Sequence, residues 1–144
     1  MSHRLLGVVL ALSIIGAAIA GYLTYTHYDE AALVCTVGSC TTVQQSAYST
    51  LGPVPIALGG VAMYLAVGGL ALARLRRPDP RNDERATFVS WTILCAGVAY
   101  AAYLTYVELW VIEAVCRWCV ASAVVSVVLL GLESLLVWRI LERP

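Results

Sequence analysis

Four cysteines in two pairs are the residues of this sequence best suited to chemistry. Cys116 and Cys119 form a CxxC motif that opens a long apolar run, and Cys35 and Cys40 lie in a more polar stretch. Residues three apart on a helix share a face, close enough for two sulfurs to bridge. The N–H groups at a helix N-terminus also favour a thiolate, the attacking species in thiol–disulfide exchange. The two pairs therefore predict electron transfer by such exchange.

The bulk composition predicts a membrane protein. The chain has 144 residues, of which 60% are hydrophobic and 12% charged, and its mean hydropathy is +0.82. An average soluble domain is about 45–50% apolar and about 25% charged, and a chain this short cannot bury the excess in one water-soluble core. The net charge is zero and no basic run is long enough to predict nucleic-acid binding, so membrane lipid is the expected surrounding.

Four apolar stretches are each long enough to cross a hydrocarbon core of about 30 Å as a helix. A signal peptide cleaved after Ala20 is the alternative for the first, but the apolar run continues past that point, so we expect a retained span. We predict an all-α integral membrane protein, with one domain over 1–144, a four-transmembrane-helix bundle and no fused thioredoxin domain. The predicted spans are about 5–27, 55–75, 86–109 and 115–141.

The arginines predict the orientation of this bundle. They fall almost entirely on one side of four alternating spans, while the other side carries Asp29, Glu30, Glu113 and a single arginine, Arg117. By the positive-inside rule both termini are then cytoplasmic, in a multi-pass protein of the cell inner (plasma) membrane. Both cysteine pairs lie on the outer, periplasmic or extracellular side, which is oxidising and lets disulfides persist. The arginines assigned to the cytoplasmic side are Arg4, Arg74, Arg76, Arg77, Arg81, Arg85, Arg139 and Arg143.

The connections between the spans carry their own signals. Arginines at 74–85, with Pro78 and Pro80 between them, predict a basic connector that breaks the helix. In the outer loop, 28–54, Ser39 is expected to cap a short surface helix over Thr41–Ser49. The low hydrophobicity of this loop and Gly38 would permit it to move.

Other readings of the cysteines and acids stay open. A structural zinc site built from the four outer thiols and a purely structural pair of disulfides are alternatives, although the small CxxC loop suits exchange better. Haem attachment would need a histidine after Cys119, where Val120 stands. Cys95, inside the third span, is expected to be a small apolar residue. A transporter would hold an ionisable group in mid-membrane, whereas Glu108 and Glu133 fall near predicted helix ends.

Three stretches resemble bacterial homologues of vitamin K epoxide reductase (VKOR). Residues 103–123, which include the CRWC motif, are similar to the corner between the third and fourth helices of that family. Residues 21–27 resemble the end of its first helix. The two loop cysteines, Ser46 and the Gly-Pro-Val-Pro run at 52–55 match its first outer loop. The resemblance covers nearly the whole chain and combines four cysteines, a loop serine and a four-helix topology.

The resemblance implies a quinone-linked thiol oxidoreductase. Cys116 and Cys119 would be the active-site pair, with Cys119 facing the quinone, and Cys35 and Cys40 would be the shuttle pair. A separate thioredoxin-fold (DsbA-like) protein would supply the electrons. They would leave on a membrane quinone of the menaquinone, ubiquinone or vitamin K type, so that disulfides form outside the cytoplasm. Ser46 would lie beside the quinone; a serine on a helix surface is the alternative.

Helix geometry and the family pattern refine this expectation. Ser122 and Ser126 continue the helix face of Cys119 and leave room for a flat ligand, although tight helix packing explains small residues equally well. Ala123 stands four positions after Cys119, and the asparagine and tyrosine that hold the quinone in the animal enzymes have no match. Quinone reduction is thus implied more strongly than epoxide reduction. The alternatives are the same core acting as a vitamin K epoxide or quinone reductase, and a zinc-braced membrane scaffold.

Overall fold

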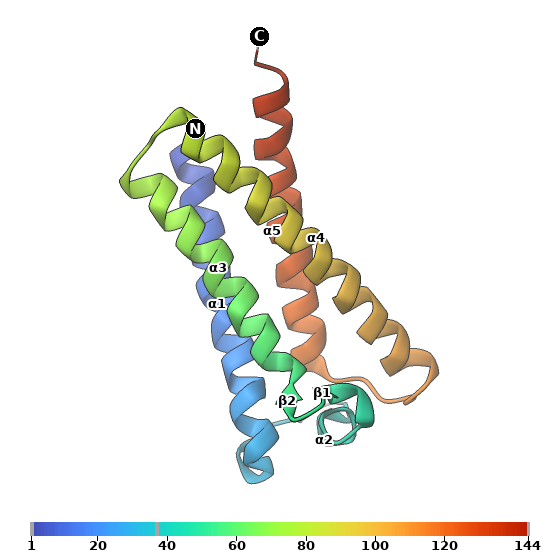
Figure 1. The fold of residues 1–144 in the computed structure, drawn as a ribbon. Coiled ribbons are helices and arrows are strands. Elements are labelled where there is room, and N and C mark those ends of the chain that lie inside the picture. The colour runs from blue at the N-terminus through green and yellow to red at the C-terminus, as the bar shows by residue number, and fades with distance from the viewer. Residues whose placement is uncertain (1, 37, 144) are drawn as a thin grey trace.

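The architecture is a bundle of four long helices, seen in a computed structural model that describes residues 2–36 and 38–143 (Figure 1). Each of the four is long and apolar enough to cross a membrane. The predicted all-α membrane bundle is therefore confirmed. The four helices are α1 (Ser2–Tyr28), α3 (Ile56–Arg76), α4 (Pro80–Trp110) and α5 (Arg117–Leu141).

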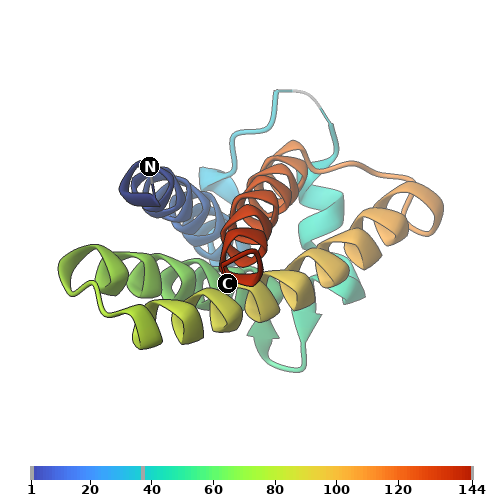
Figure 2. The same cartoon turned by 90° about the horizontal axis from the view of Figure 1, so that it is seen from above.

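The two ends of the bundle differ in what they carry. Both termini and the α3–α4 connection lie at one end, which we call the arginine end (Figure 1). The loop 29–55 and the turn 111–116 lie together at the opposite end, which we call the cysteine end; Figure 2 shows it behind the termini. From the arginine end, α3 and α4 diverge toward the cysteine end, whereas α1 runs alongside α3 (Figure 1).

Tyr64 of α3 crosses the core of the bundle. The Tyr64 ring is 1% exposed and lies against Gly16 of α1, where a Cβ atom would overlap the ring carbons. Its hydroxyl donates to the Ser122 carbonyl of α5 at 2.7 Å and lies 2.9 Å from the Ser122 hydroxyl. Small residues at such crossings let membrane helices approach closely. One side chain thus joins three of the four spans.

At the arginine end, the prediction that Arg74 belongs to a helix-breaking connector is wrong, because Arg74 lies within α3. Its side chain is 3% exposed and makes a bidentate ion pair with Glu133 of α5, with N–O distances of 2.9 and 3.2 Å. A third hydrogen bond, of 2.9 Å, reaches Thr87 of α4. Glu133, which the sequence places near a predicted helix end, is fully buried, and Arg74 is the partner that a buried charge requires.

The α3–α4 connection is also shorter than predicted. Helix α4 begins at Pro80 rather than near 86, so Arg81 and Arg85 are helical. Proline is favourable at the first helical position, where its missing N–H has no intrahelical partner. Asp79 caps this helix by accepting a hydrogen bond from the Arg81 N–H at 3.3 Å. Pro80 therefore starts a helix instead of prolonging a break.

The loop between α1 and α3 folds into short elements instead of the one predicted helix over 41–49. They are η1 (Glu30–Ala32), α2 (Cys40–Gln44), η2 (Ala47–Ser49), and the antiparallel strands β1 (Thr50–Leu51) and β2 (Val54–Pro55). Helix α2 ends early because serine hydroxyls donate hydrogen bonds to its last two carbonyls. Ser46 donates to Val43 O and Ser49 to Gln44 O, both at 2.7 Å. Ser39 precedes α2 but makes no side-chain cap; its N–H donates to Val115 O at 3.0 Å.

Candidate active site

The structure brings the four cysteines of the two pairs to one place at the cysteine end. Cys35 and Cys40 form a disulfide with a Cα–Cα distance of 6.2 Å, whereas Cys116 and Cys119 are thiols. Cys40 is 1% exposed and Cys116 is fully buried, and both belong to one apolar cluster with Leu23 of α1. Cys35 and Cys119 pack against the same cluster and are only half-buried. The buried members of the two pairs therefore share one cluster.

The turn before α5 positions Cys116. Glu113 adopts a left-handed backbone conformation with φ of 53°, and the Ala114 N–H donates to the Glu108 carbonyl at 3.0 Å. The Cys116 N–H then donates to the Glu108 carboxylate at 3.1 Å. Cys116 is the N-cap of α5, and its sulfur accepts a hydrogen bond from the Cys119 N–H at 3.4 Å. The CxxC motif thus begins a helix, as its spacing predicts.

The electrostatics of this cap distinguish the two thiols. The pKa of the Cys116 thiol is lowered, chiefly because the Cys119 thiol donates a hydrogen bond to its sulfur and also because the Cys119 N–H does. Burial and the Glu108 carboxylate oppose this shift without cancelling it. Cys116 is therefore the thiol primed to become a thiolate, which is the form that exchanges with disulfides.

The segment that carries Cys35 is docked on the first turn of α5 and the end of α1. The Tyr22 hydroxyl donates to the Ala32 carbonyl at 3.1 Å and accepts from the Val34 N–H at 2.8 Å. The Trp118 indole N–H donates to the Val34 carbonyl at 3.0 Å, and its ring lies 5.1 Å from that of Tyr22. Arg117 donates to the Thr36 hydroxyl at 3.0 Å. The two residues inside the CxxC motif therefore hold the loop.

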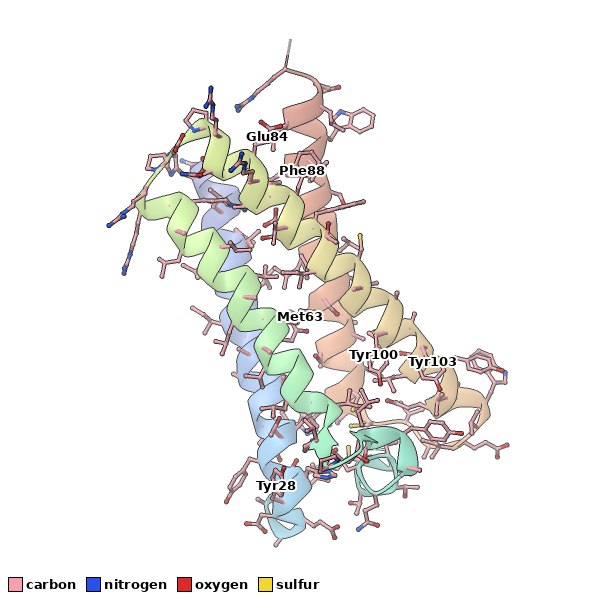
Figure 3. All side chains as sticks on the ribbon, in the orientation of Figure 1. Tyr28, Met63, Glu84, Phe88, Tyr100 and Tyr103 are labelled. Carbon is pink, nitrogen blue, oxygen red and sulfur yellow. A yellow bond between two sulfur atoms is a disulfide. The ribbon has the colours of Figure 1, made fainter. Side chains whose placement is uncertain are left out.

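A cavity of about 530 Å³ opens beside Cys119 and extends into the bundle between α3 and α4. Met63 of α3 and Tyr100 of α4, labelled in Figure 3, belong to its two facing walls. Its lining is mostly apolar, with polar groups toward the cysteine end. A concave, largely apolar site with a few polar groups is typical of small-molecule binding, and this volume lies in the usual range of about 300–1,000 Å³.

The residues predicted to meet a quinone all line this cavity. Cys119, Ser46 and Ser122 contribute to its wall, as does Ser126 on the same helix face. The Ser46 hydroxyl donates to the Val43 carbonyl, so its remaining hydrogen-bonding capacity is as an acceptor. The cavity brings these residues together from the outer loop and α5. Their roles toward a quinone stay predictions.

Tyr64 and Glu108 are among the polar lining residues of the cavity to which sequence reasoning gave no part in the site. Both stand out in retrospect: Tyr64 is the one aromatic residue of the predicted span 55–75, and Glu108 is the one charged residue of the span 86–109. A charged residue within a membrane span is a functional candidate by default, because its burial in lipid is costly. Its place near a predicted helix end concealed this signal.

The zinc alternative does not match this arrangement. A closed zinc site needs four ligands, and two of the four outer sulfurs are joined in a disulfide. Among the described residues, no group of three or more histidine, cysteine or acidic side chains is placed to hold a metal ion.

The comparison with protein families shows which family the chain belongs to. Residues 7–134 match the Vitamin K epoxide reductase family. The chain belongs to this family. The match begins in α1 and ends in α5, so it includes the cavity and both cysteine pairs of this VKOR-family protein. A comparison with curated proteins found no match. Family membership and the four spanning helices identify a multi-pass membrane oxidoreductase, as the resemblance implied.

Proposed function

We propose that this VKOR-family protein oxidises a separate thioredoxin-fold (DsbA-like) protein and passes the electrons to a membrane quinone. The route runs through Cys35 and Cys40, then through Cys116 and Cys119, and supports disulfide formation outside the cytoplasm. The observation that carries this proposal is the shared cluster of Cys40 and Cys116, with Cys119 on the wall of an apolar cavity. The two dithiol pairs thus connect an aqueous loop with a lipid-facing site.

The first transfer takes place at the outer loop. A partner thiolate attacks Cys35, the less buried sulfur of the disulfide, and Cys40 leaves as a thiolate. The second partner thiol then resolves the mixed disulfide, so the partner leaves oxidised and the loop pair is reduced. Cys40 next attacks Cys116 of the oxidised inner pair and releases Cys119. Attack of Cys35 on Cys40 restores the loop disulfide, which yields the redox state seen in the structure.

The inner dithiol then delivers two electrons to the quinone and returns to the disulfide. The cavity suits such a substrate because its walls are apolar, and because hydroxyls at its cysteine end can meet the quinone carbonyls. Ser122 supplies one such hydroxyl. The Ser46 and Tyr64 hydroxyls donate to the Val43 and Ser122 carbonyls, so each can donate to the quinone only after it rotates away from that carbonyl. Quinone reduction is favourable where the potential of the membrane quinone lies above that of the thioredoxin-fold partner, which is about −120 mV for a strongly oxidising one.

The proposed orientation places the cysteine end outside and both termini in the cytoplasm of a plasma-membrane protein. Its support is the sequence bias, in which arginines gather at the arginine end. Arg74 is removed from this count because Glu133 neutralises it inside the bundle. The exposed arginines of the α3–α4 connection and of the C-terminal end still predict that the arginine end is cytoplasmic.

The decisive experiment is dithiol oxidation by purified protein in lipid, with a soluble quinone analogue as acceptor. Cys116→Ala and Cys119→Ala each abolish quinone reduction, because each removes one sulfur of the inner disulfide. Cys95→Ala is the matched control, since Cys95 lies on α4 and is absent from the lining of the cavity. Turnover that survives either inner-pair substitution would contradict the proposed route.

The order of the two pairs has a separate test. Cys35→Ala blocks oxidation of a thioredoxin-fold protein but preserves turnover with a small dithiol that reaches Cys116 directly. The two reductants are compared in the same preparation, so a folding defect would lower both rates. An equal loss with both, in protein that still binds quinone, would exclude a shuttle role for the loop.

A further inference from the structure

A carboxyl group lies in the cavity beside the reacting thiols. Glu108 is 5% exposed and lines the cavity together with Cys119. Among the described lining residues it is the one acid, and no arginine, lysine or histidine is among them. A carboxylate in an apolar membrane cavity is costly to retain. This burial requires an explanation beyond packing.

Only one of the two oxygens of the Glu108 carboxylate is engaged by the CxxC motif. Oε2 accepts the hydrogen bond from the Cys116 N–H at 3.1 Å, which orients the side chain. Oε1 makes no hydrogen bond to a described residue, and it is not among the buried polar atoms that lack a partner. One oxygen is therefore anchored at the CxxC motif, and the other is free to exchange a proton within the cavity.

We propose that Glu108 carries a proton between the Cys119 thiol and the quinone, a role that rests on the proposed function above. The observation behind it is a carboxylate anchored to Cys116 in the same cavity as Cys119. A proton carrier must reach both the donor and the acceptor of the proton, and Glu108 shares with Cys119 the wall of the cavity in which the quinone is proposed to bind.

The step balances as follows. Cys116 enters as a thiolate and Cys119 as a thiol, and the formation of their disulfide bond releases two electrons to the quinone. The Cys119 proton passes to Glu108 and from there to one quinone oxygen, so Glu108 returns to its starting state. The second proton of the hydroquinone comes from outer water and replaces the one that Cys116 has lost. No further oxidant or reductant takes part.

Other titratable groups around the cavity are less suited to this role. Tyr48, Tyr64 and Tyr100 contribute hydroxyls to its wall from the outer loop, α3 and α4. A phenol has a single oxygen, so it cannot stay anchored through one atom and exchange a proton through another, as a carboxylate can. The Tyr64 hydroxyl is also committed to Ser122. Glu108 is the one lining residue that combines a carboxylate with contact to the CxxC motif.

The competing explanation is structural, because Glu108 also accepts a hydrogen bond from the turn before α5. Glu108→Gln separates the two roles: the amide oxygen still accepts from the Cys116 N–H, but the amide group cannot carry the proton. Glu113→Gln is the matched control, since Glu113 lies in the same turn, is exposed, and loses the same charge. Glu108→Ala removes both roles and leaves space for a small acid.

The experiment measures turnover of a small dithiol with a quinone analogue in lipid, together with quinone binding by tryptophan quenching. Glu108→Gln lowers kcat by about 100-fold, in line with the usual contribution of a positioned acid or base. Quinone affinity stays within about two-fold, and formate restores part of the rate of Glu108→Ala. Glu113→Gln behaves as the parent protein in every measurement.

A second readout does not depend on turnover. The Glu108 charge raises the pKa of the Cys116 thiol, so its removal shifts the pH profile of Cys116 alkylation to lower pH. Glu113→Gln leaves this profile in place. This shift verifies that the carboxylate is charged beside the reacting sulfur, as a proton acceptor must be.

The outcomes separate the two proposals. A parent protein that reduces no quinone would contradict the proposed function itself. Normal kcat in Glu108→Gln, with loss only in Glu108→Ala and no rescue by formate, would overturn proton transfer and leave a structural cap. An unshifted alkylation profile would also overturn it, because the group would then carry no charge at the site.

Discussion

Removal of one oxygen atom at Tyr22 tests how the loop that carries Cys35 is held against α1 and α5. Tyr22→Phe keeps the ring and its contact with Trp118 but deletes two hydrogen bonds, to the Ala32 carbonyl and from the Val34 N–H. A neutral hydrogen bond contributes about 0.5–1.5 kcal/mol net, so the docked loop loses about 1–3 kcal/mol. Because 1.4 kcal/mol is tenfold, the undocked population rises about 5-fold to about 140-fold.

Hydrogen exchange of the Ser39 amide measures this opening. Ser39 donates its N–H to the Val115 carbonyl at 3.0 Å and makes no contact with the deleted hydroxyl, so it reports whether the loop opens as a unit. Its exchange rate in detergent rises by the same factor as the undocked population, provided that closing is faster than exchange. Tyr28→Phe is the control, because Tyr28 is 72% exposed and its hydroxyl bonds no described residue.

An unchanged Ser39 exchange rate in Tyr22→Phe would refute this account of docking. Faster exchange at Val34 alone would show that only the deleted bond opened, and would also contradict a loop that moves as one body. The proposed shuttle needs this motion, because the loop disulfide must meet both a soluble partner and the buried Cys116. We therefore expect Tyr22→Phe to slow transfer from the loop pair to the inner pair more than turnover of a small dithiol.

Two further substitutions test the bundle. Gly16→Ala places a Cβ atom against the Tyr64 ring, and overpacking of about 1–3 kcal/mol lowers the melting temperature and weakens quinone binding. Gly21→Ala, on the same helix and with open space around it, leaves both properties unchanged or slightly raises the melting temperature; equal effects of the two would show that the ring simply moves aside. Cys95→Ala changes kcat by less than about two-fold, since a half-buried thiol behaves as a small apolar group. A large loss there, measured by the same quinone assay, would reveal a role for the fifth thiol.

Local signals in the sequence predicted most of the fold. The length and hydropathy of a span are properties of one continuous stretch, so the four helices could be read before any contact was known. Their ends were less certain where two local rules compete. Pro80 can break a helix or begin one, and the choice depended on Asp79 as its cap. Ser39 has the right type for a cap, but Val115 from a distant turn engages its backbone.

By itself, the sequence determined that this is a four-span membrane protein with two cysteine pairs in its polar connections, because composition and spacing are local. Tertiary structure decided the rest. Only the packing of the loop against α1 and α5 buries Cys40 with Cys116 in one cluster. Only the divergence of α3 and α4 opens the cavity, and both Glu108 and Cys119 line its wall. These neighbours are far apart in the chain, and their approach depends on helix packing that no single stretch encodes.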